Sequence, residues 1–217
     1  MYDTPIEISV SAAPTASVIW LHGLGADGND FAPVVDMLNL PHVRFILPHA
    51  TYKKVTANND YEMRAWYNIY SFKPDSREDD TGIRESQVYI ETLIEHEIER
   101  GIPAKRIVIA GFSQGGAIAL QTALRYKQAL AGVMALSTYL PLKLTLEKEK
   151  TKENQDIAIF MAHGTFDNVI TLSTCRSSYD ILQAQQYKIH WHEYAMAHSV
   201  NQEEIDDIRA FLRTTLP

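Results

Sequence analysis

A serine between glycines is the residue of this sequence most suited to chemistry. Residues 111–115 read Gly-Phe-Ser-Gln-Gly and fit the pattern G-x-S-x-G. The β-branched run 107–110 before them predicts a buried parallel strand, and residues 116–124 after them predict a helix packed closely on a sheet. A tight turn between strand and helix exposes a serine hydroxyl at the end of a sheet, and the flanking glycines permit a strained backbone there. Ser113 is therefore predicted to be a nucleophile.

A serine hydroxyl is a poor nucleophile at neutral pH, so it needs a base, and the base needs a carboxylate to orient it. After a G-x-S-x-G turn these partners follow in the order Asp or Glu, then His, each in a loop after a strand. Asp167 follows the apolar run 157–161, and His198 follows the run 189–194. The chain order therefore predicts a catalytic triad of Ser113, Asp167 and His198.

Each partner of the serine also has a structural interpretation. A loop aspartate is usually a turn former or a helix cap, and Asp167 stands just before a helix expected to begin near Thr171. His198 taken alone is explained as a solvent-facing loop residue. Asp156, which precedes a strand, and Asp180, which lies in a helical stretch, fit the acid position less well. Considered with the serine, both residues favour the triad.

Acyl transfer also needs two preorganised N–H donors for the oxyanion, and losing one costs about 3–4 kcal/mol. One donor is predicted to be the backbone N–H of Gln114, directly after the nucleophile. The other is expected in the glycine-rich loop 22–28, where Leu24 is the candidate. A glycine-rich loop after a strand is also typical of phosphate binding, but the P-loop lysine and the G-x-G-x-x-G fingerprint are both missing.

The remaining histidines and the cysteine are assigned structural roles. His190 and His192 point to the same side of a strand, as two metal ligands would, but no third ligand is evident and a surface pair on an edge strand is favoured. His22 and His163 stand at strand ends before glycine and are expected to make structural hydrogen bonds. Cys175 is expected to be a small apolar filler in the helix after the acid. The sequence therefore predicts no metal site.

The composition limits the classes of function. The chain has 217 residues, of which 46% are hydrophobic and 22% charged, and its formal net charge is −7. This length fits one domain over residues 1–217, and the acidic balance argues against nucleic acid and anionic membrane surfaces as partners. We find no signal peptide and no apolar run near the roughly 20 residues of a membrane span, so no integral membrane association is expected. A single cysteine fits a reducing compartment, which favours a cytoplasmic location.

Short apolar runs alternate with helical stretches, which predicts an α/β fold with a mainly parallel sheet covered by helices on both faces. Helices are predicted over 83–100 and after Asn201. The segment 51–80 has no helical period and is expected to be a functional loop, and the mixed-charge run 147–153 a solvated surface segment. The predicted strands are 18–21, 43–47, 107–110, 133–136, 157–161 and, toward an edge, 189–194.

Four stretches spread over nearly the whole chain resemble the acyl-protein thioesterase and bacterial carboxylesterase family, also called the phospholipase/carboxylesterase family. They are residues 21–31 (Leu-His-Gly-Leu-Gly-Ala-Asp-Gly-Asn-Asp-Phe), 64–67 (Arg-Ala-Trp-Tyr), 111–117 (Gly-Phe-Ser-Gln-Gly-Gly-Ala), and His163-Gly164 with Asp167. The resemblance implies an α/β-hydrolase fold with no large lid, a Ser-Asp-His triad, no metal and no cofactor. It implies small carboxylic esters, acyl thioesters on S-acylated proteins, or lysophospholipids as substrates.

The resemblance also implies an apolar groove for the acyl chain. By the family match this groove would be lined by Trp66, Tyr67 and Phe72, and by Leu142 and Val169 near two strand ends. Burying each methylene of an acyl chain against such walls is worth about 0.8 kcal/mol. Packing within the domain explains each of these residues equally well.

The sequence departs from the family pattern in two places. Ala197 precedes the predicted base where the family usually has glycine, and Ile170-Thr171 replaces the usual Val-Pro after the acid. An alanine is harmless where the backbone dihedrals are ordinary, but costly where φ must be positive. These departures affect the expected shape of the histidine loop rather than the identity of the triad.

Two other classes of function stay open on the sequence. A hydrolase fold that has lost catalysis would bind a ligand or partner instead, but such a protein usually lacks a triad member, and all three are present here. An apolar surface around the groove would make a homodimer, as the resemblance to some bacterial members permits. Dimerisation is compatible with catalysis, so the leading hypothesis is a serine hydrolase.

Overall fold

The computed structural model describes residues 2–71 and 76–217 of the chain. The predicted bounds of two strands, 43–47 and 189–194, are confirmed to the residue. In chain order the strands and helices are β1 (Ile6–Ile8), β2 (Ala16–Leu21), α1 (Ala32–Leu38), β3 (Val43–Leu47), β4 (Tyr52–Val55), β5 (Tyr61–Arg64), α2 (Asp80–Glu99), β6 (Ile107–Phe112), α3 (Gln114–Ala123), β7 (Gly132–Leu136), α4 (Leu146–Glu149), β8 (Ala158–Gly164), α5 (Leu172–Ala184), β9 (Ile189–Tyr194) and α6 (Gln202–Thr215).

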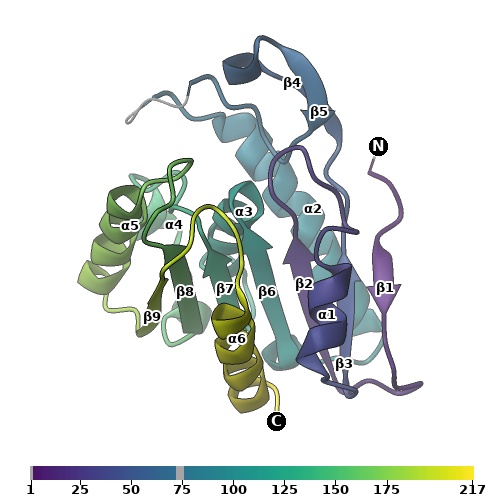
Figure 1. The fold of residues 1–217 in the computed structure, drawn as a ribbon. Coiled ribbons are helices and arrows are strands. Elements are labelled where there is room, and N and C mark those ends of the chain that lie inside the picture. The colour runs from purple at the N-terminus through teal and green to yellow at the C-terminus, as the bar shows by residue number, and fades with distance from the viewer. Residues whose placement is uncertain (1, 72–75) are drawn as a thin grey trace.

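The central sheet has seven strands in the order β1-β3-β2-β6-β7-β8-β9. All neighbouring pairs are parallel except β1 with β3, so the prediction of a mainly parallel sheet with 189–194 at an edge is confirmed. Because β2, β6, β7, β8 and β9 are parallel, their carboxyl ends all lie at the same end of the sheet (Figure 1). The loops that leave these ends carry the residues predicted to do chemistry.

Helices cover both faces of the sheet, and each face has its own hydrophobic cluster. Helices α2, α3 and α5 pack on one face, whereas α1 and α6 lie together on the other, as Figure 1 shows. Successive residues of β2 alternate between the two: Ile19 and Leu21 belong to the first cluster, and Val18 and Trp20 to the second. This burial on both faces explains why the strand sequences are almost continuously apolar.

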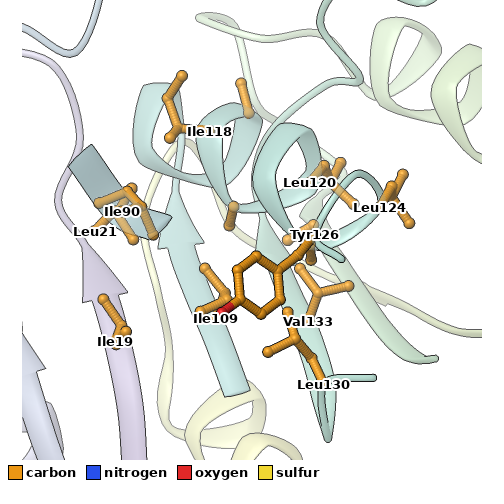
Figure 2. Packing of buried hydrophobic residues seen from close by; sticks show 14 of the residues in the cluster. Ile19, Leu21, Ile90, Ile109, Ile118, Leu120, Leu124, Tyr126, Leu130 and Val133 are labelled. Atoms are coloured by element: carbon orange, nitrogen blue, oxygen red, sulfur yellow. The ribbon is translucent and has the colours of Figure 1, made fainter. Parts of the chain in front are cut away.

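Figure 2 shows the first cluster at close range, where side chains of β2, β6 and β7 meet those of α2 and α3. Ile109 of β6 and Val133 of β7 are completely buried, as are Ile118 and Leu120 of α3. Burying an aliphatic side chain of this size contributes about 1.5–3 kcal/mol. The cluster therefore holds α3, and with it the turn that carries Ser113, rigidly on the sheet.

Glycines bring the first turn of α3 unusually close to the strands. A Cβ atom on Gly115 would lie 2.5 Å from the carbonyl oxygen of His22, and one on Gly111 would lie 2.3 Å from the backbone of Gly115. No side chain fits into either space, so the glycines of the G-x-S-x-G pattern are required by packing. Their effect is to press the start of α3 against the loop that follows β2.

Residues 52–64, at the start of the segment 51–80, have secondary structure that the sequence does not predict. Strands β4 and β5 form an antiparallel hairpin, which Figure 1 shows beyond the carboxyl end of the central sheet. Its turn contains Asn59 and Asp60, with φ of 56° and 55°, a conformation that Asn and Asp tolerate better than other non-glycine residues. The prediction of a loop without secondary structure is therefore wrong for residues 52–64. The strands were missed because most of their side chains are polar and lack an apolar alternation.

The mixed-charge run 147–153 is also not a uniformly solvated segment. Glu149, at the end of α4, accepts hydrogen bonds from Arg84 of α2, from Arg125 and from Thr145. Burial alone raises the pKa of Glu149, but these hydrogen bonds outweigh burial and lower the pKa to about 2. This carboxylate ties α4 to α2, whereas Glu147 and Lys148 beside it are exposed as predicted.

Two of the predicted helices, α2 and α6, begin at side-chain caps. Helix α2 begins at Asp80, three residues before the predicted start, because Asp79 accepts a hydrogen bond from Gly82 N. Helix α6 begins directly after Asn201, whose side chain accepts from Glu204 N, as the sequence indicates. In the part of the chain that the structure describes, no helix is long and apolar enough to cross a membrane.

Candidate active site

Ser113 forms the turn between β6 and α3 and has a strained backbone. Its φ is 54° and its ψ is −121°, a conformation that costs a non-glycine residue about 1–3 kcal/mol. The strain is held by hydrogen bonds from Ser113 N to the oxygen of Leu136 (2.9 Å) and from Thr138 Oγ1 to the oxygen of Ser113 (2.6 Å). The side chain is 8% exposed, at the carboxyl end of the sheet. This geometry matches the expected strand–turn–helix position of a nucleophile.

Asp167 and His198 meet at the same end of the sheet. His198 Nδ1 lies 2.6 Å from Asp167 Oδ2, although 31 residues separate them in the chain. The other carboxyl oxygen, Oδ1, accepts from the backbone N–H groups of Val169 (2.8 Å) and Ile170 (2.9 Å). Because a carboxylate only accepts hydrogen bonds, His198 Nδ1 carries the proton, and its Nε2 is left as an acceptor. This is the tautomer that a base for a serine hydroxyl requires.

His198 lies beside the serine turn. Its ring packs on Phe112, directly before Ser113, with 4.7 Å between ring centroids. The loop that carries it rests on the end of β8, where a Cβ on Gly164 would come within 2.4 Å of the carbonyl oxygen of Ala197. Within the residues described, no hydrogen bond joins the Ser113 hydroxyl to His198. In free enzymes this bond is often long and shortens when substrate binds.

His163 is a neighbour of the acid that sequence reasoning assigned only a structural role. Its Nε2 donates to the oxygen of Ile170 (2.7 Å) and lies 3.3 Å from Asp167 Oδ2. Burial lowers the pKa of His163, which favours the uncharged ring. The expected structural hydrogen bond is confirmed, and in addition the ring helps to fix the loop that presents Asp167. The signal available in the sequence was the His163-Gly164 pair at the end of a strand.

The loop after β2, which carries Leu24, lies beside the serine turn that is followed by Gln114. A Cβ on Gly23 would lie 3.5 Å from Ser113 Cβ, so this loop runs directly past the nucleophile. Leu24 follows Gly23, and Gln114 begins α3 on the other side of the serine. Neither Leu24 N nor Gln114 N donates to a protein oxygen within the described chain. Both amides are therefore free to bind a ligand oxygen.

His22, at the start of this loop, has a structural role, as predicted. Its Nδ1–H donates to the oxygen of Gly23 (2.7 Å), and its Nε2 accepts from Ala50 N (3.0 Å). Burial lowers the pKa of His22 to about 4, so the ring is uncharged at neutral pH. An uncharged ring with this tautomer satisfies one donor and one acceptor of the surrounding backbone.

The residues assigned to the acyl groove occupy different environments. Trp66 and Tyr67 are buried in the core, and Leu142 is buried with a φ of 45°, whereas Val169 is 58% exposed. Phe72 lies outside the described residues. The role of these side chains in acyl binding stays a prediction.

A polar contact that sequence reasoning missed joins two groove segments. The hydroxyl of Tyr67 lies 2.7 Å from that of Tyr139, and Glu78 accepts a hydrogen bond from Leu142 N (3.0 Å). Burial raises the pKa of both tyrosines, so their hydroxyls stay protonated and keep this contact. Nothing in the local sequence signals the two contacts, because the partners are 72 and 64 residues apart in the chain. The contact fixes the segment after β7 to the segment after β5.

His190, His192 and Cys175 have structural surroundings. His190 and His192 are on the edge strand β9 and pack on Phe211 and Phe160. Cys175 is completely buried in α5, and burial raises the pKa of its thiol to about 12, which fits an apolar filler. Among the residues described, no group of three or more His, Cys, Asp or Glu side chains is placed to hold a metal ion.

Comparison with known proteins shows the family to which the chain belongs. The sequence model of the phospholipase/carboxylesterase family matches residues 5–216. The chain belongs to that family. Acyl-protein thioesterase 1 of Neurospora crassa is 41% identical to it over 225 residues, which cover 98% of this chain and 92% of the relative. Acyl-protein thioesterase 1 of Yarrowia lipolytica is 38% identical, with 97% of this chain and 96% of the relative covered.

Solved structures of related proteins have the same fold as this chain. Acyl-protein thioesterase 2 of Zea mays superposes with a TM-score of 0.90 at 25% identity, over 100% of both chains. SOBER1 of Arabidopsis thaliana gives a TM-score of 0.89 at 26% identity, over 93% of this chain and 99% of that chain. The predicted α/β-hydrolase fold without a large lid domain is confirmed, and the protein is a hydrolase.

The two departures from the phospholipase/carboxylesterase family pattern cause no visible distortion. Ala197 is not among the residues with positive φ, so alanine fits there as well as glycine would. Thr171 caps α5 by accepting a hydrogen bond from Thr174 N, and Ile170 contributes only backbone atoms to the hydrogen bonds around Asp167. Neither departure therefore requires a strained backbone in the histidine loop or in the loop of Asp167.

Proposed function

We propose that this protein hydrolyses carboxylic esters and acyl thioesters through a covalent acyl-serine, with Ser113 as the nucleophile. His198 Nε2 accepts the hydroxyl proton as Ser113 Oγ attacks the carbonyl carbon, and then gives that proton to the leaving alcohol or thiol. Asp167 holds the imidazole in its tautomer and stabilises its charged form. A water molecule, deprotonated by His198, then attacks the acyl-serine and releases the acid.

The observation that carries this proposal is the hydrogen bond of 2.6 Å between Asp167 and His198 beside a serine with positive φ. When Ser113 attacks, negative charge develops on the carbonyl oxygen of the substrate. The amides of Leu24 and Gln114 are the proposed hydrogen-bond donors to this oxyanion. Such donors act best when they are fixed before the reaction begins. The arrangement needs no metal or cofactor for any of these steps.

The proposed substrates carry an apolar acyl chain. Curated relatives are named acyl-protein thioesterases, which supports S-acylated proteins as one substrate class. Ester and thioester carbonyls undergo the same attack, so the groove walls rather than the triad select the acyl group. We retain two further proposals from the sequence: a cytoplasmic location, based on the single cysteine, and a homodimer, which light scattering would detect.

The test is turnover of a chain-length series of p-nitrophenyl esters by the wild type and by Ser113→Ala, together with fluorophosphonate labelling. We expect labelling of the wild type and a loss of both labelling and turnover in the variant, by about 10⁴-fold or more in kcat. The preferred chain length reports the length of the groove. A folded wild type that neither labels nor turns over would favour a ligand-binding protein without catalysis.

A further inference from the structure

We propose that the side chain of Gln114 is a positioning residue that fixes the two oxyanion donors relative to each other. The inference rests on the proposed function, in which the amides of Gln114 and Leu24 bind the oxyanion. These amides belong to different segments, one at the start of α3 and one in the loop after β2. Something must therefore hold the two segments in register.

The side chain of Gln114 is buried and makes hydrogen bonds to the backbone of another segment. It is 2% exposed, although the serine before it lines the site. Its Oε1 accepts from Trp66 N (2.8 Å), and its Nε2 donates to the oxygen of Tyr67 (2.8 Å). Two bonds to consecutive residues define the position and the orientation of the amide group. The start of α3 is thereby fixed to residues 66–67.

Trp66 connects this contact to the other donor loop. Its indole is completely buried, and Nε1–H donates to the carbonyl oxygen of His22 (2.8 Å). The His22 ring in turn binds the oxygen of Gly23 and the amide of Ala50. The backbone from His22 to Leu24 is therefore held at two points, one of which depends on Trp66.

A direct backbone contact closes the ring. A Cβ atom on Gly115 would lie only 2.5 Å from the carbonyl oxygens of Leu21 and His22. The first turn of α3 therefore packs directly against the backbone of the loop. The ring runs from the Gln114 side chain through Trp66 and His22 and back to Gly115. A displacement of about 1 Å in a positioned group costs up to about 10²-fold in rate, so holding the donors is worth a measurable amount.

The inference predicts a specific kinetic change in Gln114→Met. Methionine keeps the length and the packing of the side chain but removes both hydrogen bonds to residues 66–67. We expect kcat for a p-nitrophenyl ester to fall about 10- to 100-fold with KM changed less than threefold, because the donors act on the transition state. The inhibition constant of an alkyl boronic acid, which forms a tetrahedral adduct on Ser113, should rise in proportion.

Two further variants separate positioning from general destabilisation. Gln121→Met removes a buried glutamine from the same helix, whose Nε2 donates to Gln87 of α2 (2.8 Å) rather than to residues 66–67, and kcat should stay within twofold of the wild type. Trp66→Phe keeps an aromatic ring and the backbone hydrogen bond to Gln114 but removes the indole donor to His22. If Gln114→Met fails to fold, this variant should show the same fall in kcat and the same weaker binding of the boronic acid. Circular dichroism and thermal melting show which variants are folded.

The outcomes distinguish this inference from the proposed function. A folded Gln114→Met or Trp66→Phe with kcat within threefold of the wild type overturns the positioning role while Ser113→Ala still loses turnover. A rise in KM with unchanged kcat also overturns it, since that would indicate a substrate contact. A wild type without turnover and without boronic acid binding overturns both proposals.

Discussion

Buried polar groups gather at both ends of the central sheet, and they are satisfied to different degrees. At the amino end, Glu97 of α2 is completely buried and accepts hydrogen bonds from Ser17, Arg44 and Arg100. At the carboxyl end, Ser113 has a strained backbone, and the amides of Gln114 and Leu24 have no protein acceptor within the described residues. The buried carboxylate at the amino end is paired within the protein, whereas two amides at the carboxyl end have no protein acceptor in the described chain and can bind a ligand.

The amino end is stabilised by internal pairing, whereas the carboxyl end has the features expected of a reactive site. A buried charge costs several kcal/mol unless it is paired, and the Glu97 carboxylate is paired on both oxygens. Strain and unpartnered donors cost free energy, and they persist only where surrounding contacts enforce them. At the carboxyl end the bond that Thr138 donates to Ser113, and the bonds that the Gln114 side chain accepts from Trp66 and donates to Tyr67, supply that enforcement. Changes at the two ends should therefore affect different quantities.

The largest effect is expected for Asp167→Asn, at the carboxyl end. Asparagine keeps an acceptor for the amides of Val169 and Ile170 but can no longer hold His198 in the tautomer that accepts the serine proton. We expect kcat to fall about 10⁴-fold while the thermal midpoint changes by less than about 2 °C. Steady-state kinetics and melting of the same preparation check this. A decrease below tenfold would remove Asp167 from the triad.

Glu97→Ala, at the amino end, should have the opposite signature. It leaves Arg44 buried without a counter-charge, so the free energy of unfolding should fall by about 3–5 kcal/mol while turnover per folded molecule stays within twofold. Urea unfolding and ester turnover give the two numbers. Replacing both partners, Arg44→Met with Glu97→Met, should recover most of the loss. A drop in kcat with unchanged stability would reverse the contrast between the ends.

Glu204 is a buried carboxyl group without a paired charge in the described chain, unlike Glu97, and it should make stability depend on pH. Neither of its carboxyl oxygens has a partner among the described residues, and burial, with a smaller contribution from Asp207, raises its pKa to about 8. Its unfolded-state pKa is near 4.5, so the folded state binds the proton more tightly, and stability falls as pH rises from about 4.5 through 8. Near the upper end this decline is on the order of 1 kcal/mol per pH unit.

Replacing the carboxyl group should remove that decline. Glu204→Gln has no proton to lose, so its free energy of unfolding should change less between pH 5 and 8 than that of the wild type. The exposed neighbour gives a matched control, Glu203→Gln, which should keep the wild-type pH dependence. Urea unfolding at pH 5, 6.5 and 8 decides the matter. Parallel curves for the wild type and Glu204→Gln would mean that another group titrates.

The smallest effect is expected for Ala197→Gly, which restores the residue usual in the family. Ala197 lacks a positive φ, so glycine relieves no strain and adds only freedom to the unfolded chain, worth about 0.5–1 kcal/mol of lost stability. Ester turnover should stay within twofold of the wild type. A tenfold rise in kcat would show that alanine restrains the histidine loop during catalysis.

Most of the central sheet was predictable because its strands are buried on both faces and read as continuous apolar runs. The edge strand β1 was missed, since it has only three residues and pairs antiparallel with β3 alone. The hairpin of β4 and β5 was missed for its polar side chains, although the Asn59-Asp60 pair is a turn signal. Glu149 was assigned to solvent because a charge run does not indicate which member meets Arg84 and Arg125.

The α/β-hydrolase class and the order of the candidate triad can be predicted from the sequence, because local glycines and apolar runs encode the strand–turn–helix unit around Ser113. Which distant groups meet is visible in the folded structure alone. Gln114 reaches the backbone of Trp66 and Tyr67, 48 and 47 positions away, and His163 comes to lie against Asp167. Such contacts depend on how α3, the hairpin segment and the strand ends pack together. No local pattern carries that information, since the same side chains would fit many other neighbours.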